Sequence, residues 1–248
     1  MILFKKNFFD KKNINKINKD INSILIQFSK KNKNKKKSNS ELFEDCTNIS
    51  IKLRQNVYKT FSKLFTINLL LNEKKVHKIL SKKGFKNTVL AAYSIVVMEP
   101  KMKKFLFPFH QDLKTRHSKK SISMWIPLND NLKNMGGLEL IKDSEKFGPI
   151  PHFINQKGLT EIKNFYMKKM RKMKRIKITK YKRGDVLFFS PYTVHKSIPN
   201  FHSKESRWSL IAQFDDLTNP YHLRKSTFPF KIEKYSTQST NESFRTKR

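Results

Sequence analysis

Three side chains in this sequence could bind a transition metal together. His110 and Asp112 form an H-x-D pair, and His195 follows much later in the chain. In extended backbone, residues i and i+2 project to the same side, so the imidazole and carboxylate of the pair can converge on one ion. A second imidazole from a distant strand would complete a 2-His-1-carboxylate site, which suits Fe(II) and leaves positions open for a cosubstrate and O₂. A turn histidine beside a turn aspartate is the alternative interpretation of the pair alone.

The residues around His195 favour a site inside a folded core. Gly184-Asp185 and the apolar run Val186–Phe189 predict a turn and a strand shortly before that histidine. Further on, Arg207 and Ser209 share the polar face of an alternating segment. The opposite face carries Trp208, Leu210, Ala212 and Phe214. A guanidinium on a cavity-facing position can hold a carboxylate bidentately, and a hydroxyl beside it can add a hydrogen bond.

Several apolar segments are expected to position these residues. Alternating or β-branched patterns predict strands, which are Val89–Met98, Ser121–Leu128, Leu138–Ile141, Val186–Phe189 and Arg207–Phe214. Apolar residues three and four apart predict helices between residues 51 and 84, one of them over Glu73–Lys83 with Gly84 as its left-handed end. Helices followed by short strands indicate a mainly β fold with flanking α-helices, built on a sandwich or barrel core.

The composition divides the chain into three parts. Residues 1–50 are rich in lysine and asparagine and predict a basic, flexible N-terminal arm. Residues 51–224 predict a single domain, with helices over 51–84 and the β core over about 88–216. Residues 225–248 are mostly polar and predict a loose C-terminal tail.

Composition also excludes several classes of protein. The chain has 248 residues, of which 37% are hydrophobic, so a wholly disordered protein is not expected. The single Cys46 excludes an internal disulfide framework and a cysteine-rich zinc site. No segment reaches the ~20 apolar residues that cross a bilayer, and the start of the chain lacks a signal-peptide pattern, so we expect a cytoplasmic protein.

The net charge of +35 invites a nucleic-acid or anionic-membrane interpretation. The chain is rich in Lys, Asn and Ile together, which is also the drift of an AT-rich genome. Interleaved aromatic platforms for bases are not seen, which counts against a nucleic-acid binder.

The ordered combination of FHQD, SMWIPL, GDVLFFSPYTVHKS and SRWS resembles the phytanoyl-CoA dioxygenase family of Fe(II)/2-oxoglutarate oxygenases, over roughly residues 88–216. The resemblance implies a double-stranded β-helix, or jelly roll, with iron on His110, Asp112 and His195. It implies that Arg207 holds the distal carboxylate of 2-oxoglutarate. It places five further residues near this cosubstrate, namely Ser197, Trp125, Gln111, Ser209 and, as the match on the strand before the metal motif, Ile95. One departure follows Gly136-Gly137, where Asp143 and Glu145 replace the Gly and His of a family turn.

The resemblance implies hydroxylation of a C–H bond in a small organic substrate, with O₂ as second cosubstrate and decarboxylation of 2-oxoglutarate to succinate. Related halogenases lack the carboxylate ligand, so the presence of Asp112 favours hydroxylation. His117 is placed to line the substrate entrance. Basic residues near the motif favour an anionic substrate, with a solvated lysine-rich surface as the alternative; they are Lys114, Arg116, Lys119 and Lys120. The competing hypotheses are a nucleic-acid-directed oxygenase or binder and an inactive metal-binding β-barrel.

Overall fold

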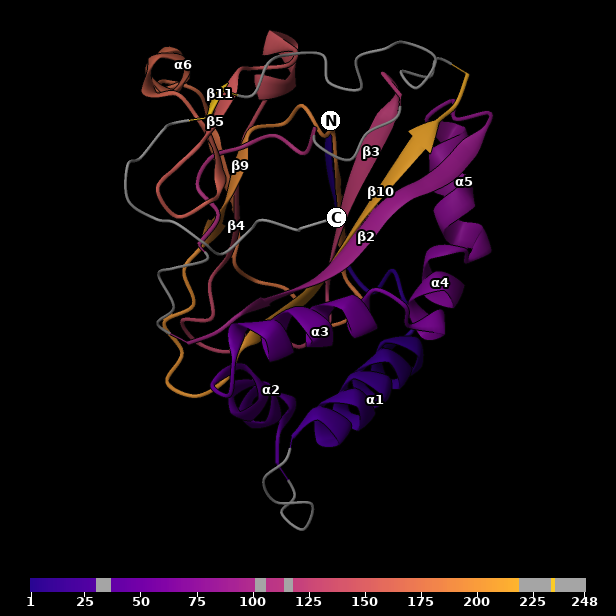
Figure 1. The fold of residues 1–248 in the computed structure, drawn as a ribbon. Helices are drawn as coiled ribbons and strands as arrows, with labels where there is room; N and C mark the ends of the chain where they lie inside the picture. The colour runs from indigo at the N-terminus through magenta and orange to yellow at the C-terminus, as the bar shows by residue number, and fades with distance from the viewer. Residues whose placement is uncertain (30–36, 101–105, 114–117, 219–232, 235–248) are drawn as a thin grey trace, which may run out of the picture.

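The computed structural model describes residues 1–29, 37–100, 106–113 and 118–218, together with the backbone of 233–234 (Figure 1). Its α-helices are α1 (Lys11–Phe28), α2 (Asn39–Thr47), α3 (Ile51–Phe61), α4 (Phe65–Leu71), α5 (Lys74–Lys82) and α6 (Asn164–Lys169). Its longer strands are β2 (Thr88–Met98), β3 (Ser121–Pro127), β4 (Gly137–Ile141) and β10 (Arg207–Asp216). The shorter strands are β1 (Ile2–Lys5), β5 (His152–Ile154), β6 (Thr160–Ile162), β7 (Arg175–Ile178), β8 (Val186–Phe189), β9 (His195–Ile198) and β11 (Glu233–Lys234).

Antiparallel sheets form the centre of the molecule. The large sheet has the strand order β1-β8-β3-β10-β2, and a smaller sheet has the order β7-β4-β9. A third sheet, β11-β5-β6, lies beside the smaller one, and its β11–β5 pair is parallel. Neighbours in the large sheet are far apart in sequence, as expected of a jelly roll, and the predicted mainly β class with flanking helices is confirmed.

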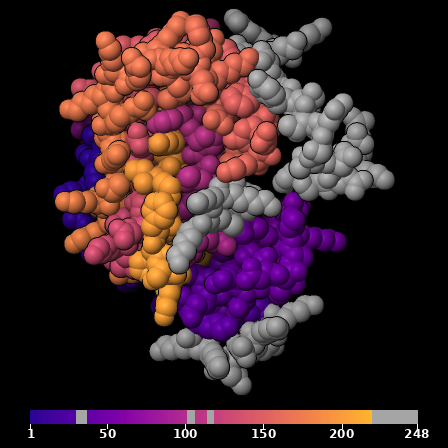
Figure 2. Space-filling view, turned by 90° about the vertical axis from the view of Figure 1, so that its left-hand side faces the viewer, coloured from indigo at the N-terminus to yellow at the C-terminus, as the bar shows by residue number. Residues whose placement is uncertain are grey.

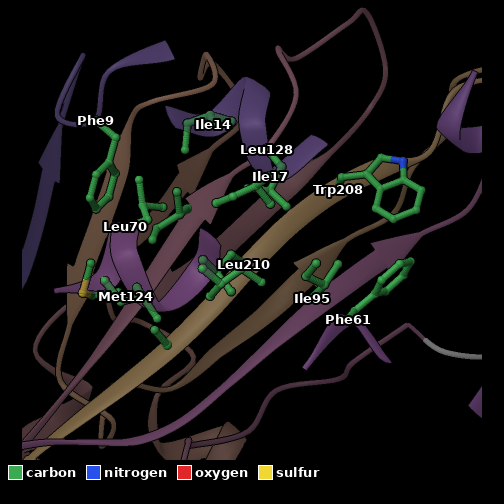
Figure 3. Close-up of a cluster of buried hydrophobic side chains, with 14 of the residues drawn as sticks. Phe9, Ile14, Ile17, Phe61, Leu70, Ile95, Met124, Leu128, Trp208 and Leu210 are labelled. Carbon is green, nitrogen blue, oxygen red and sulfur yellow. The ribbon is translucent and has the colours of Figure 1, made fainter. Parts of the chain in front are cut away.

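The large sheet has one face toward the helices and one toward the smaller sheet. Because side chains alternate across a strand, every second residue of β10 and β3 enters the helix-side core, as predicted. Trp208, Leu210 and Met124 pack there against Ile17 and Phe61 of the helices (Figure 3). The other face, with Trp125, Leu187 and Phe189, packs against Leu138 and Leu140 of β4. That second face is the wall on which the candidate site is built.

The expectation of a flexible arm over residues 1–50 is wrong for the described part of that segment. β1 adds to the edge of the large sheet, with Ile2 opposite Phe189. α1 begins at an Asp10 cap and buries four apolar residues in the main core, Ile14, Ile17, Ile21 and Leu25. Their spacing of three and four residues outweighs the lysine content, because the lysines occupy the solvent side of the same helix. Residues 30–36 lie outside the described part.

The helices predicted between residues 51 and 84 are confirmed as α3, α4 and α5. Gly84 follows α5 with φ of +74°, the left-handed conformation expected after a helix. In the side view of Figure 2, the purple helices lie directly against the strands of the second half of the chain. They close the helix-side core and leave the opposite face of the sheet to the site.

The predicted polar tail over 225–248 lies outside the described residues, apart from the backbone of β11. Among the described helices, none is long and apolar enough to cross a membrane.

Candidate metal and cosubstrate site

The structure brings His110, Asp112 and His195 together at one point between the sheets. The Nε2 atoms of both histidines lie 3.7 Å from Asp112 Oδ1. One ligating atom from each residue can be chosen so that all three lie within 4.8 Å of one another. This arrangement has the donor types of a 2-His-1-carboxylate site with one side left open.

Backbone pairing explains why residues so remote in sequence meet. His110 and His195 form an isolated antiparallel bridge, in which each N–H donates to the other's carbonyl, at 2.9 and 3.0 Å. Each imidazole is oriented by its Nδ1, which contacts the carbonyl of Pro108 at 2.8 Å or of Thr193 at 3.0 Å. With Nδ1 donating to a carbonyl, Nε2 is left as the lone-pair nitrogen that faces the other ligands.

The carboxylate of Asp112 is oriented by a neighbour on β3. Ser123 Oγ donates to Asp112 Oδ2 at 2.9 Å, while the Asp112 N–H donates to the Pro191 carbonyl at 3.0 Å. Oδ1 is thereby left toward the two histidines. Hydrogen bonds of this kind fix the direction in which a carboxylate offers its lone pair to a metal. Ser123 was not identified from the sequence, although it shares the polar face of a predicted strand.

Burial affects the protonation of the site. Desolvation, together with the charge of His195, lowers the pKa of His110 to about 4. The His110 imidazole is therefore neutral at pH 7, the form in which it can bind a metal.

The turn that departs from the family pattern supports the strand of His195. Asp143 has φ of +62°, a left-handed conformation that aspartate tolerates better than most residues. The next residue, Ser144, accepts the Val194 N–H on its hydroxyl at 2.8 Å and donates to the Ile141 carbonyl at 2.7 Å. The altered turn thus still fixes the residue directly before His195.

A cavity of about 260 Å³ adjoins the three ligands. It is lined by residues from both sheets, which include Ser94, Val96, Phe107, Trp125, Leu138, Phe189, Ser197, Arg207, Ser209, Ile211 and Gln213. The walls are largely apolar, with a few convergent polar groups, as is usual for a small-molecule site.

Arg207 is the charged side chain that this cavity adds to the three ligands. It is 2% exposed, and its Nη1 donates to the Ile198 carbonyl at 2.7 Å and the Met135 carbonyl at 3.3 Å. Its Nε is buried without a hydrogen-bond partner among the described residues. Desolvation lowers the pKa of Arg207 to about 10, so the guanidinium is still charged at neutral pH. A buried cation with an orphaned donor requires an anion, and the carboxylate of a cosubstrate would supply it.

Gly136 makes room for this guanidinium. It has φ of +75°, and a Cβ added there would lie 2.2 Å from the Pro199 carbonyl oxygen and 2.9 Å from Arg207 Nη1. Only glycine fits the position without displacing the arginine or the neighbouring backbone.

The structure places four of the five further expected cosubstrate residues in the cavity wall, which are Ser197, Trp125, Ser209 and Gln111. Ser197 and Trp125 line it, and the Trp125 ring is held at 90° to Tyr181 with centroids 5.0 Å apart. Ser209 also lines it, and its hydroxyl donates to the Val96 carbonyl at 3.3 Å.

Of the expected cosubstrate residues, Ile95 lies outside the cavity wall, and Gln111 lies in it with an amide that is bonded to the backbone. Ile95 lies opposite Leu210 and packs in the helix-side core, so the expectation for Ile95 is wrong by one position in the alternation of β2. Its neighbours Ser94 and Val96 line the cavity. The Gln111 amide is occupied by the backbone: it donates to the carbonyls of Gly148 and Tyr192 and accepts from the Ile150 N–H.

His152 is a cavity residue that the sequence did not single out. It is 1% exposed, and its Nε2 accepts the Gln111 N–H at 2.9 Å. Burial lowers its pKa to about 4, so the ring is neutral and keeps this acceptor. His152 and Gln111 together fasten the loop before β5 to the metal motif. The only sequence signal was a histidine next to a short apolar segment.

Most of the residues expected at the entrance lie outside the described part of the chain, and Lys120 does not line the cavity. His117, Lys114 and Arg116 lie outside the described part of the chain. Lys120 donates to the Gly84 carbonyl and lies 3.4 Å from Asp216, so it does not line the cavity.

A scan of family models matches residues 2–208 to the phytanoyl-CoA dioxygenase (PhyH) family, and the chain belongs to this family. The match includes most of residues 1–50, which the composition predicted to be a flexible arm outside the domain. No curated protein sequence matches the chain significantly. The residues present fit the iron and 2-oxoglutarate that the family uses, because the donor set, the neutral imidazole and the orphaned guanidinium each meet one requirement of those groups.

Solved structures share the fold at low sequence identity. AviO1 from Streptomyces viridochromogenes Tue57 is 16% identical, with a TM-score of 0.55, over 88% of this chain and 91% of that one. The non-heme monooxygenase ThoJ is 13% identical, with a TM-score of 0.59, over 87% of this chain and 74% of that one. The α-ketoglutarate-dependent carbocyclase SnoK from nogalamycin biosynthesis is 14% identical, with a TM-score of 0.56, over 87% and 79%.

Proposed function

We propose that this protein hydroxylates a C–H bond of a small organic substrate, using Fe(II), 2-oxoglutarate and O₂. The observation that carries the proposal is the joint geometry of the three ligands and Arg207 on one small, mostly apolar cavity. When bound, the iron supplies the activation of O₂, coupled to decarboxylation of 2-oxoglutarate to succinate. The side chains bind and orient these partners and exclude water from them.

Each polar group of the cavity has a task in this proposal. His110, Asp112 and His195 hold the metal through Nε2, Oδ1 and Nε2. Arg207 pairs with the far carboxylate of 2-oxoglutarate, which Ser197 and Ser209 support by hydrogen bonding. No side-chain general base is required, so none is assigned.

The ligand set favours hydroxylation over halogenation. Asp112 occupies the position that must be vacant for a halide to bind the metal, which argues against halogenation. Proteins with the same fold include an epimerase and a carbocyclase, and these outcomes are tested by product analysis. The described cavity wall carries one cation beyond any bound metal, Arg207, and this cation is assigned to the cosubstrate. An uncharged reacting group therefore fits the described walls better than an anionic one.

An anaerobic titration tests the proposal. Purified protein is mixed with Fe(II) and then with 2-oxoglutarate, while the weak visible absorption of a chelated complex is recorded. We expect the absorption to appear in the wild type and in the exposed control His77→Ala, and to be absent in His195→Ala. On admission of air, succinate should form in the first two only. If the folded wild type showed neither the absorption nor succinate, the protein would be better explained as an inactive member of the family.

A further inference from the structure

A second hollow, lined by residues other than those of the metal cavity, carries a cluster of lysines. The hollow has a volume of about 510 Å³ and is lined by Lys6, Asn7, Lys11, Asn131, Lys180, Tyr181, Lys182 and Asp185. We call this set the basic pocket. It shares no lining residue with the candidate metal cavity. Its walls come from the loop between β1 and α1, the first residue of α1, the loop between β3 and β4, and the loop before β8.

The four lysines of the basic pocket form no ion pair with any described residue. Within the described part of the chain, none of them forms an ion pair, whereas Lys37, Lys75 and Lys196 each contact a carboxylate elsewhere. Four exposed lysines that line one hollow raise the positive potential there and so favour a bound anion. A solvated lysine-rich face would instead spread such charges over a convex surface.

The single acid in the pocket is occupied by the backbone. Asp185 is 3% exposed, and its Oδ1 and Oδ2 accept the N–H groups of Asn7 and Lys182, both at 2.8 Å. The carboxylate therefore ties the two loops together and does not form an ion pair with the surrounding lysines. The pocket keeps an excess of positive charge.

The walls of the pocket are fixed before any ligand binds. The Phe9 N–H donates to the Gly184 carbonyl at 2.7 Å, which joins the two loops a second time. The Asn131 N–H donates to the Tyr181 carbonyl at 3.1 Å. Because the backbone is already ordered, the conformational cost to the protein of binding is limited to the ordering of flexible lysine ends.

We propose that the basic pocket binds a phosphate-bearing anion. Lysine ammonium groups bind phosphate as point charges, and the side-chain amide of Asn7 can add a hydrogen bond to its oxygens, whereas the Asn131 amide already donates to the Gly136 carbonyl at 3.1 Å. Such a group could belong to a soluble phosphorylated compound or to a lipid headgroup, and the two sources share this chemistry. The proposal is independent of the proposed oxygenase activity, since it uses none of the same residues.

Lysine protection tests this site locally. The full chain is treated with a limiting acetylating reagent, with and without pyrophosphate at constant ionic strength, and modified lysines are quantified by mass spectrometry. We expect pyrophosphate to protect the four pocket lysines at least about threefold and to leave Lys59 and Lys63 on the helical side unprotected. If all exposed lysines were protected to the same extent, the anion would be attracted only by the overall charge, and the proposal would be overturned.

Binding affinity provides the matched comparison. The double variant Lys180→Gln/Lys182→Gln is compared by calorimetry with Lys59→Gln/Lys63→Gln, which removes the same charge from exposed positions on α3 and just after it that do not line the pocket. We expect the pocket variant, which loses two of the four lysines around the anion, to bind pyrophosphate about tenfold more weakly. The control should weaken binding less than twofold, because isolated exposed charges contribute little. Equal weakening in both variants, or no binding by the folded wild type, would contradict the proposal.

Vesicles separate the two sources of phosphate. Phosphatidylcholine vesicles with and without phosphatidic acid are sedimented with the wild type and the two double variants. Retention that depends on phosphatidic acid and is lost only in the pocket variant identifies a lipid headgroup. Pyrophosphate binding without such retention identifies a soluble phosphorylated ligand.

Discussion

Replacement of Arg207 is the most direct test of the cosubstrate assignment. The guanidinium is buried, charged and without an acidic partner among the described residues, and its Nε has no hydrogen-bond partner. Arg207→Met removes both the charge and the donors. Arg207→Lys keeps a charge but loses the planar fork that fits a carboxylate.

The expected losses follow from the contacts available. A charge-assisted hydrogen bond contributes roughly 1.5–3 kcal/mol, and a guanidinium facing a carboxylate can make two. Taking about 3 kcal/mol as the loss in Arg207→Met, 2-oxoglutarate affinity should fall about 100-fold, since 1.4 kcal/mol is tenfold. Arg207→Lys, which retains one such contact, should lose about tenfold.

The assay is calorimetric titration of the Fe(II)-loaded protein with 2-oxoglutarate in the absence of O₂. Arg54→Met is the matched control, because Arg54 pairs with Glu99 outside the cavity lining and its loss should lower stability without changing this affinity. Circular dichroism verifies that each variant folds, since Arg207 also donates to two backbone carbonyls. A folded Arg207→Met variant that binds iron and keeps its 2-oxoglutarate affinity within threefold would refute the assignment.

Three further predictions concern the support of the site and the fold. Ser123→Ala leaves Asp112 Oδ2 without its donor, so Fe(II) affinity should fall about 10-fold or more in a competition assay, and unchanged affinity would show that the hydroxyl does not orient the ligand. Gly136→Ala forces a Cβ against Arg207 and nearby backbone, so 2-oxoglutarate affinity should fall while iron binding persists; equal affinity would show that the loop yields freely. Although burial opposes it, hydrogen bonds from backbone amides hold the pKa of Asp216 well below its usual range. Its stabilisation is therefore present above about pH 4 and is lost as the pH falls toward the folded pKa. Asp216→Asn should lower thermal stability at pH 7 and flatten the loss of stability as the pH falls below about 4, and an unchanged melting profile would contradict this.

The strands were predictable from the sequence because their two faces differ so clearly. In β10, the residues on one face are apolar and meet the helices, while the other face carries Arg207, Ser209 and Gln213 into the cavity. Because side chains alternate between the two faces of a strand, assigning one residue to a face assigns all the others. The same rule explains the error at Ile95, where a match shifted by one residue selected the wrong face of β2.

The N-terminal segment shows what composition hides. Lysine and asparagine dominate its first forty residues, yet Ile14, Ile17 and Ile21 are fully buried in the core. Long lysine side chains on one face of a helix do not oppose burial of the other face, so net charge says little about whether a segment folds. β1 was still less predictable, because an edge strand of four residues gains its stability from a partner, β8, that lies far along the chain.

The site itself was predictable in its ligands and less so in its supports. His110, Asp112 and His195 are distinguished by residue type, whereas Ser123 and His152 act through single hydrogen bonds that only the folded chain reveals. A serine on a polar strand face and a lone histidine are common in any sequence. Their roles depend on which backbone or carboxylate atom lies within 3 Å, and that is decided by tertiary pairing.

The distribution of charge separates recognition at the surface from chemistry in the interior. The chain carries a net charge of +35, but the described cavity wall holds one cation besides any metal, and that cation is buried. Exposed charges are screened within about 10 Å at 0.1 M salt, so the lysine-rich surface can steer an anion such as 2-oxoglutarate toward the protein without holding it in the cavity. In the proposed function, retention there depends on Arg207, because salt screens a buried ion pair much less than an exposed one. The surface charge is therefore no reason to expect an anionic group beside the carbon that reacts. An excess of positive charge lines a hollow of the described surface at the basic pocket instead.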